Sequence, residues 1–329
     1  MFTGEIDGRK FRDIVKILRT VIGRSEEIFR NIFFDSGVIS ATDGCLRVFT
    51  SVSVPGKFAA PSDVIWALSK HSKGVIKVTT RKGSVKFESD GMELILEDKE
   101  ALFPRKTEGK MFLGKFGKDF WRALDFVSRP LDEDDPVEVH FNGKVAVAVG
   151  KSGGITALYI FGESSGIWSG KIPYQSTRRF VKSFSWAKEY EIFGGEDLCV
   201  NAEGFHAYIC CEDARPLQKL PDVDKCAIMS KIRLSSLLEK AHDVLGRAFV
   251  MIEASGGMVR LYGKRGGIRL RLEEKCSENI SFRAFVPIRK FKSYISSVSS
   301  KSICVSVQGE MTIFTDRGRK RYVIAKAAI

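Results

Sequence analysis

Apolar residues recur along the chain at positions i, i+3, i+4 and i+7, the spacing that forms one face of an amphipathic helix. The spacing occurs six times, and successive first positions are separated by 53, 56, 57, 57 and 57 residues. The residues at these positions are Phe11, Ile14, Val15, Leu18; Val64, Ala67, Leu68, His71; Phe120, Ala123, Leu124, Val127; Thr177, Phe180, Val181, Phe184; Leu234, Leu237, Leu238, Ala241; and Phe291, Tyr294, Ile295, Val298, of which only His71 and Thr177 are polar. One structural unit is therefore predicted to recur six times.

Proline marks every second predicted helix. Pro61, Pro173 and Pro287 each follow a short basic segment, and they lie 112 and 114 residues apart. Proline suits the first turn of a helix, where its missing N–H would have no partner. The doubled period predicts three domains of two units each, at residues 1–110, 111–224 and 225–329.

Short β-rich segments separated by turn residues lie between the predicted helices. After the second helix, residues 75–79, 84–88 and 92–96 alternate in this way, with Asp90-Gly91 between the last two. Asn142-Gly143 and Gly256-Gly257 repeat the punctuation in other units. With one strand before each helix the unit is β-α-β-β-β, which predicts an α+β fold with sheets outside and helices inside. A six-bladed propeller also repeats four strands, but its blades do not need a helix at a fixed position.

The composition agrees with a globular protein, because 44% of the 329 residues are hydrophobic and 28% are charged. A run of about 18 apolar residues, as a membrane-spanning helix needs, does not occur. The first residues lack the apolar stretch of a signal peptide. We therefore expect a cytoplasmic protein with no membrane partner.

Chemistry-bearing residues form no recognisable catalytic or metal-binding pattern. The seven cysteines lack the C-x-x-C spacing of a zinc site and are an odd set, so we expect buried thiols rather than a disulfide framework. The four histidines are scattered without a nearby nucleophile. The sequence accordingly predicts a protein that is not an enzyme, with no catalytic residues, no metal and no cofactor.

The positive charge is concentrated in the predicted helices. The helical windows 8–20, 61–73, 117–129, 173–185, 231–247 and 287–301 carry a net charge of +15, whereas the whole chain carries +13. The remainder of the chain is therefore slightly acidic. Basic residues lie opposite the apolar face of the first, fourth and sixth helices, at 100° per residue. Side chains of this kind neutralise phosphates without reading bases, and the candidates are Arg9, Arg12, Lys16, Arg19, Arg178, Arg179, Lys182, Arg289 and Lys292.

The number of helices bears on the number of chains. Six helices of about 10 Å diameter placed side by side leave an opening of only about 10 Å. The major groove of duplex DNA alone is about 12 Å wide. A ring around DNA would therefore need about twelve helices, and hence two chains.

The order of these units resembles the bacterial DNA polymerase III beta subunit, the sliding clamp, over the whole chain. The marks that carry the resemblance are Ile39-Ser40-Ala41-Thr42-Asp43-Gly44, Ala101-Leu102-Phe103-Pro104, Leu220-Pro221-Asp222-Val223, Arg321-Tyr322-Val323-Ile324 and the segments before Pro61, Pro173 and Pro287. The resemblance implies a head-to-tail dimeric ring that encircles duplex DNA without sequence preference. It also implies a clamp loader as partner and a hydrophobic pocket that takes a linear peptide from DNA polymerase.

The resemblance further implies specific contact residues. The dimer interface would contain Phe103 on one protomer, with Val244 and Leu245 on the other. The peptide pocket would contain Leu220, Pro221, Val323 and Ile324.

This chain departs from the family pattern in three ways. Ala325-Lys326-Ala327-Ala328 stands where the family usually has Met-Pro-Met-Arg, and Lys151-Ser152-Gly153-Gly154-Ile155-Thr156 stands where it has Thr-Asp-Gly-His-Arg-Leu. The strongly basic total is also unusual for the family. A monomeric basic processivity factor that holds DNA on an open face remains the alternative, which sedimentation would separate from a dimeric ring.

Overall fold

The computed structural model describes residues 2–23, 27–97, 102–217, 219–221, 223, 226–275, 281–298, 300–316, 318 and 320–326. Several sequence marks lie outside these residues. They are Ala101, Asp222, the predicted boundary at 224/225, Cys276 and the terminal Ala327-Ala328.

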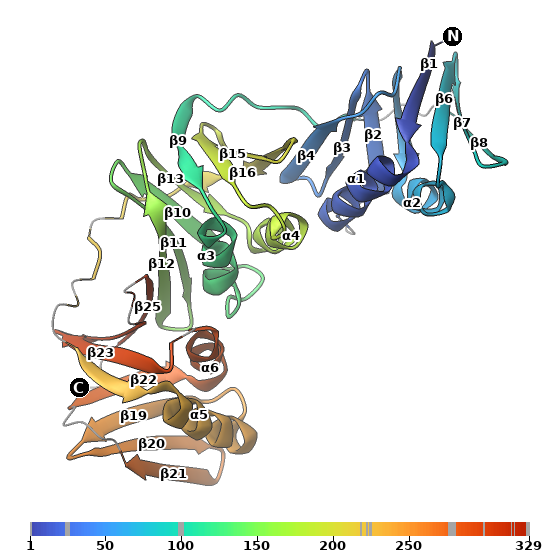
Figure 1. The fold of residues 1–329 in the computed structure, drawn as a ribbon. Coiled ribbons are helices and arrows are strands. Elements are labelled where there is room, and N and C mark those ends of the chain that lie inside the picture. Colours follow the sequence, from blue (N-terminus) through green and yellow to red (C-terminus); the bar gives the residue numbers. More distant parts are fainter. Residues whose placement is uncertain are drawn as a thin grey trace. The chain divides into compact units, whose positions relative to one another are not determined.

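Six α-helices and the strands between them follow the predicted order (Figure 1). The helices are α1 (Gly8–Val21), α2 (Ser62–His71), α3 (Asp119–Ser128), α4 (Tyr174–Phe184), α5 (Lys231–Leu245) and α6 (Ile288–Ser297). Each is preceded by a strand and followed by three, so the β-α-β-β-β prediction is confirmed. A 3₁₀ turn (Glu27–Arg30) and the short strand β17 (Glu212–Asp213) are additions. In the described part of the chain, no helix is long and apolar enough to cross a membrane.

The chain divides into two compact units, of which unit 1 comprises Met1–Trp121 and Gln175–Glu212. Its four-stranded sheet has the order β1 (Phe2–Asp7), β6 (Val75–Arg81), β7 (Ser84–Ser89), β8 (Met92–Glu97). Its eight-stranded sheet has the order β5 (Lys57–Pro61), β2 (Asn31–Asp35), β3 (Val38–Thr42), β4 (Leu46–Ser51), β16 (Phe205–Cys210), β15 (Asp197–Ala202), β14 (Tyr190–Gly194), β9 (Met111–Phe116). Helices α1 and α2 pack beside each other in this unit.

Unit 2 comprises Arg122–Tyr174 and Asp213–Ile329. Its larger sheet has the order β17, β13 (Ile167–Ile172), β10 (Val137–Asn142), β11 (Val145–Ser152), β12 (Ile155–Glu163), β25 (Arg321–Lys326), β24 (Met311–Thr315), β23 (Ser302–Gln308), β18 (Ala227–Ser230). Its four-stranded sheet has the order β21 (Ile268–Lys275), β20 (Met258–Arg265), β19 (Phe249–Ser255), β22 (Phe282–Pro287). Helices α5 and α6 pack beside each other here.

Each large sheet joins strands that the sequence assigns to neighbouring domains. In unit 1, β4 pairs with β16 and aligns Leu46 with Ile209, a pairing that we call the first seam. In unit 2, β12 pairs with β25 and aligns Tyr159 with Arg321, the second seam. The compact units therefore follow the sheets and cut across the predicted domains, whose limits stay a prediction.

The predicted apolar helix faces are buried in five of the six helices. Phe120 and Val127 of α3, like Phe180 and Phe184 of α4, have no exposed surface. Helix α2 is the exception, because it buries Ile65, Leu68 and Ser69 rather than the predicted Val64, Ala67, Leu68 and His71. The predicted face was about one residue out of register. In a ten-residue helix with both Val64 and Ile65, either register gives an apolar stripe, and packing selects one.

The prolines stand one position before the predicted place. Pro61 and Pro287 are the N-cap residues of α2 and α6, and Pro173 immediately precedes α4. Their lack of an N–H still costs nothing at a helix start. Side-chain caps serve other helices instead: the carboxylate of Asp7 accepts from the backbone N–H of Lys10 at 2.8 Å to begin α1.

A disulfide joins Cys226 to Cys304, with their Cα atoms 5.3 Å apart. The expectation that all cysteines are thiols is therefore wrong for this pair. The two residues are 78 positions apart, so no local spacing predicted the pairing. It forms where the chain enters β18 beside β23. Cys45, Cys199, Cys210 and Cys211 are free thiols.

Candidate nucleic-acid interface

Two predicted cations of helix α1 make no ion pair in the described part of the chain, whereas the other two contact groups within unit 1. Arg9 and Lys16 are exposed, and neither makes an ion pair with any residue that the structure describes. The guanidinium of Arg12 instead donates to the carbonyl oxygens of Ser69 and Ser72 at 3.1 and 3.2 Å. These carbonyls end α2, where a cation is favourable. Arg19 lies over the ring of Trp66, with Cζ 4.8 Å from the ring centroid.

Helix α4 shows the same division between free and engaged cations. Nη1 of Arg179 lies 2.7 Å from Oδ2 of Asp43, whose side chain is 2% exposed. Ser176 donates to the same carboxylate oxygen at 3.1 Å, so Arg179 stabilises the β3–β4 turn from α4. Arg178 is partly buried, whereas Lys182 is exposed and makes no ion pair within the described ranges.

In α6, one of the two predicted cations is exposed. Arg289 points to solvent, while Nζ of Lys292 lies 3.2 Å from a carboxylate oxygen of Glu239 on α5. The neighbouring Lys290 pairs with Asp132 at 2.6 Å. Spacing on a helix thus identified the polar face correctly but did not distinguish free cations from paired ones.

Lys16 of α1 and Lys182 of α4 line one hollow in unit 1. It lies between the two helices, and its lining also includes Lys10, the carboxylates of Asp13 and Glu203, and Trp186 just beyond the end of α4. Lys10 and Trp186 were absent from the predicted set. Lys10 could have been found from its place beside Arg9, whereas Trp186 lies outside any helical pattern. The arrangement can hold phosphates loosely, because flexible lysines reach them without fixed geometry.

The residues predicted for a dimer interface differ in accessibility. Val244 is 46% exposed, but Leu245 is 0% exposed and packs within unit 2 against β20, so it offers no surface to a partner. A helical side chain next to an exposed one turns by 100° and here enters the core. Phe103 is half-buried, with its ring 5.5 Å from that of Phe33. Its neighbour Leu102, which the sequence did not single out, is 81% exposed.

Each four-stranded sheet ends in two strands that have no further neighbour among the described strands, β1 and β8 in unit 1 and β21 and β22 in unit 2. Two of these edge strands carry an exposed isoleucine, Ile95 of β8 at 60% and Ile268 of β21 at 50%. An open edge with apolar side chains is a template for pairing with another strand, and the sequence pattern did not reveal which strands would be edges.

The residues predicted for a peptide pocket separate onto two faces of one sheet. Leu220 and Ile324 pack against a cluster formed by Val147, Leu158 and Tyr322. Val323 points to the other side of β25, since successive strand residues alternate, and it is 2% exposed. Val323 therefore does not share the face of Leu220 and Ile324, and its place in the pocket stays a prediction. Pro221 is partly buried beside Leu220.

The sequence also missed members of this cluster. Leu217, Val145 and Ile160 are partly buried and pack against it. The cluster could have been found only from the register of β25, which places Tyr322 and Ile324 on the same face of the sheet. The result is a partly exposed apolar surface on unit 2, which we call the Leu220–Ile324 surface.

Comparisons with known proteins identify the fold. No protein-family model matches the chain, and no curated protein matches it. Among solved structures, it is similar to the DNA polymerase III subunit beta from Pseudomonas aeruginosa, with a TM-score of 0.84 and 11% identity, covering 99% of this chain and 100% of that one. The beta subunit from Streptococcus pyogenes gives 0.79 and 13%, covering 99% and 100%. The Helicobacter pylori beta clamp bound to a DNA ligase peptide gives 0.78 and 9%, covering 100% of both chains.

The match runs along the whole chain, so the predicted α+β architecture and the resemblance to sliding clamps are confirmed at the level of the fold. The similarity survives at very low identity because the buried helix faces and sheet ladders, rather than particular surface residues, specify it. This chain has the fold of the bacterial DNA polymerase III beta subunit, the sliding-clamp fold.

Proposed function

We propose that this protein is a DNA sliding clamp, a processivity factor that encircles duplex DNA as a dimeric ring and tethers DNA polymerase. The observation that carries the proposal is the full-length match to beta-subunit structures, combined with free cations on the exposed faces of the helices. It implies a cytoplasmic, non-enzymatic protein that needs no cofactor and is placed on DNA by a clamp loader.

The proposed DNA contact is electrostatic and independent of base sequence. Arg9, Lys16, Lys182 and Arg289 are its strongest members, because each is exposed and unpaired within the described ranges. Arg12, Arg179 and Lys292 contribute less, since they already hold partners within the protein. Contacts through long side chains to phosphates allow a ring to slide.

The proposed dimer joins β8 of one protomer to β21 of the other. Both strands have an unpaired edge among the described strands and an exposed isoleucine, and pairing them would cover both edges. Leu102 and Val244 add exposed apolar surface to the proposed interface. Phe103, whose ring is half-buried, remains part of the proposed dimer interface.

The proposed site for a polymerase peptide is the Leu220–Ile324 surface. An apolar, partly exposed cluster suits the leucine or aromatic residues of a linear peptide. The Helicobacter pylori clamp of the same fold was solved with a DNA ligase peptide bound. Ile324→Glu should abolish the heat of binding of a polymerase-tail peptide in calorimetry, and an unchanged titration would remove this assignment.

The central experiment compares two triple variants of equal charge change. Arg9, Lys16 and Lys182 are replaced by glutamine in the first, and Lys82, Lys144 and Lys264, which are exposed on hairpins, are replaced in the control. The first variant should bind two unrelated duplexes equally weakly, and its log–log salt slope should flatten by up to about 3 per chain. The control should bind like the unaltered protein. Equal losses in both variants, or a loss on one duplex only, would contradict the proposal.

The oligomeric state tests the ring separately. Ile95→Asp on β8 should yield folded monomers in sedimentation equilibrium at micromolar concentration, whereas Val75→Asp, an exposed site on the inner strand β6, should leave a dimer. A clamp should also stay on circular DNA and leave the linear form by sliding off its ends. A monomer before any substitution would favour the open-faced processivity factor.

A further inference from the structure

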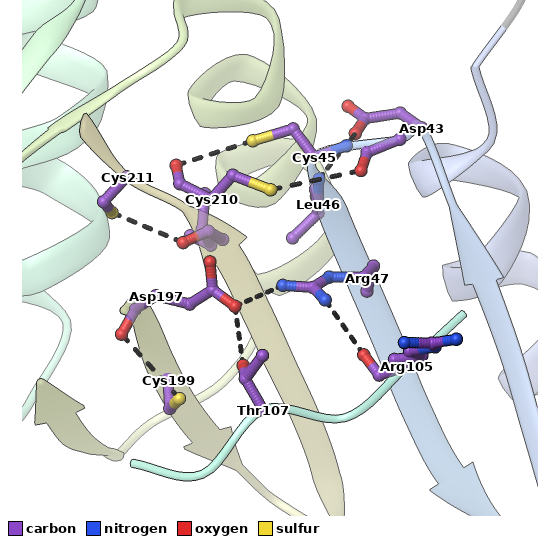
Figure 2. A network of polar contacts seen from close by, with 12 residues as sticks. Asp43, Cys45, Leu46, Arg47, Arg105, Thr107, Asp197, Cys199, Cys210 and Cys211 are labelled. Atoms are coloured by element: carbon purple, nitrogen blue, oxygen red, sulfur yellow. Dashed lines mark hydrogen bonds and ion pairs between the residues drawn. The ribbon is translucent and has the colours of Figure 1, made fainter. Parts of the chain in front are cut away.

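The free cysteines of unit 1 gather at the first seam (Figure 2). Cys45 immediately precedes β4, Cys210 ends β16, and Cys211 follows it. Cys199 lies on β15, next to β16 in the sheet. Four thiols therefore lie on or next to three neighbouring strands, although the chain separates Cys45 from the others by more than 150 residues.

Cys45 and Cys210 lie directly opposite each other. The register of β4 and β16 pairs Leu46 with Ile209, and its next step pairs Cys45 with Cys210. The backbone N–H of Cys210 donates to the carbonyl oxygen of Cys45 at 3.2 Å. Directly opposed residues of antiparallel strands have Cα atoms about 4.5 to 5.5 Å apart, which lies within the range of about 4.4 to 6.8 Å that a disulfide spans.

The two side chains lie between the same strands. Sγ of Cys45 is 3.5 Å from the carbonyl oxygen of Cys210, and Sγ of Cys210 is 4.0 Å from that of Gly44 (Figure 2). Both residues are only partly buried, so a small reagent can reach them.

The charge distribution favours a thiolate at one of these sulfurs. The hydrogen bond from Cys45, helped by the positive charge of Arg47, lowers the pKa of Cys210 to about 7, against burial and the charges of Asp197 and Asp43. The same bond raises the pKa of Cys45. Burial raises the pKa of Cys199 to about 11 and that of Cys211 to about 12. Since the thiolate is the nucleophile, Cys210 is the reactive member of the group.

We propose that Cys45 and Cys210 form a redox-active dithiol, which hydrogen peroxide oxidises to a disulfide across the first seam. The Cys210 thiolate attacks one peroxide oxygen, the O–O bond breaks, and the other oxygen leaves as hydroxide, which takes up a proton to become water. The sulfenic acid so formed is attacked by the sulfur of Cys45, and a second water leaves with the proton of that thiol. Two thiols lose two electrons, and one peroxide becomes two waters.

The disulfide would join covalently two strands that belong to successive predicted domains. None of the cations in the proposed DNA contact takes part in it, so the dithiol does not depend on the clamp function. The Cys226–Cys304 disulfide of unit 2 is a separate bond, and peptide mapping resolves the two.

Peptide mapping after oxidation tests the proposal. The full-length protein is reduced, freed of reductant, treated with one equivalent of hydrogen peroxide and digested under non-reducing conditions. Mass spectrometry should find a Cys45–Cys210 linked peptide, and Cys211→Ser, the matched control, should leave it unchanged. Cys45→Ser should stop at the sulfenic acid, which dimedone captures on Cys210. Links among other free cysteines instead, or no link with Cys210 unlabelled, would overturn the proposal.

Alkylation rates provide the second measurement and need no variant. At pH 7, iodoacetamide should label Cys210 at least about tenfold faster than Cys199 or Cys211. Its labelling rate should rise with a midpoint near pH 7, set by Cys45, Arg47, Asp43 and Asp197 around it. Equal rates at the three cysteines would show that Cys210 is no nucleophile and would overturn its proposed role.

Discussion

The two seams each join strands of neighbouring predicted domains, but different side-chain contacts stabilise them. At the first seam a buried ion pair joins Arg47 of β4 to Asp197 of β15, and Thr107 donates to the same carboxylate at 2.6 Å (Figure 2). At the second seam Arg321 lies over the ring of Tyr159, with Cζ 5.1 Å from its centroid. It also lies 5.9 Å from the ring centroid of Phe126.

The difference concerns how specific each junction must be. Buried charges need all their partners in place, so a polar seam tolerates few substitutions. Aromatic packing is less directional and tolerates replacements of similar volume. The first seam also includes an aromatic pair, Phe49 with Tyr208 at 5.5 Å, so its charged contacts are added to aromatic packing.

The largest effect is expected from breaking the charged network. Arg47→Met should lower the free energy of unfolding by about 3 to 5 kcal/mol, because it leaves the carboxylate of Asp197 buried without its cation. Chemical denaturation measures the change. The double variant Arg47→Met with Asp197→Leu should recover much of the loss. A single variant within about 1 kcal/mol of the unaltered protein would show that the ion pair does not hold the seam.

Acid should weaken the larger sheet of unit 2 away from its seam. His140 and Lys151, which contact Glu138 on β10 at 3.2 and 2.9 Å, lower its pKa from 4.5 to about 2. A depressed carboxylate pKa gives stability that is present above pH 4.5 and lost as pH falls towards 2. We expect about 2 kcal/mol of such loss. Glu138→Gln should remove this component from acid titrations of unfolding, and identical titrations for both proteins would argue against it.

The smallest effect is expected at the second seam. Arg321→Met should cost about 1 kcal/mol, because the side chain loses a cation–π contact but keeps its apolar contact with the rings. It also loses the hydrogen bond from Nη1 to the carbonyl oxygen of Ser297 at 2.9 Å. Thermal unfolding measures the change, with Arg321→Lys as the variant that keeps the charge. A loss as large as that of Arg47→Met would erase the distinction between the seams.

The sequence by itself determined the repeated unit, the places of the helices and most of their buried faces. Apolar spacing is a local property, and a face such as Phe120 with Val127 must be buried wherever the helix lies. The same pattern could not choose between Val64 and Ile65 in α2, since both alternatives were apolar. The net charge of each helix could also be counted from the sequence, and it led to the hypothesis of nucleic-acid binding.

Only the tertiary structure decided which side chains are exposed and free to contact DNA or another protein. Arg179 and Asp43 are 136 residues apart, a separation at which residue spacing cannot reveal a contact. Their ion pair engages a cation that the sequence assigned to the DNA contact. Leu245 and Val323 are buried because helix rotation fixes the face of the first side chain and strand register fixes that of the second. Cys45 meets Cys210 for the same reason: two distant strands share a ladder, and the ladder sets which residues lie opposite each other.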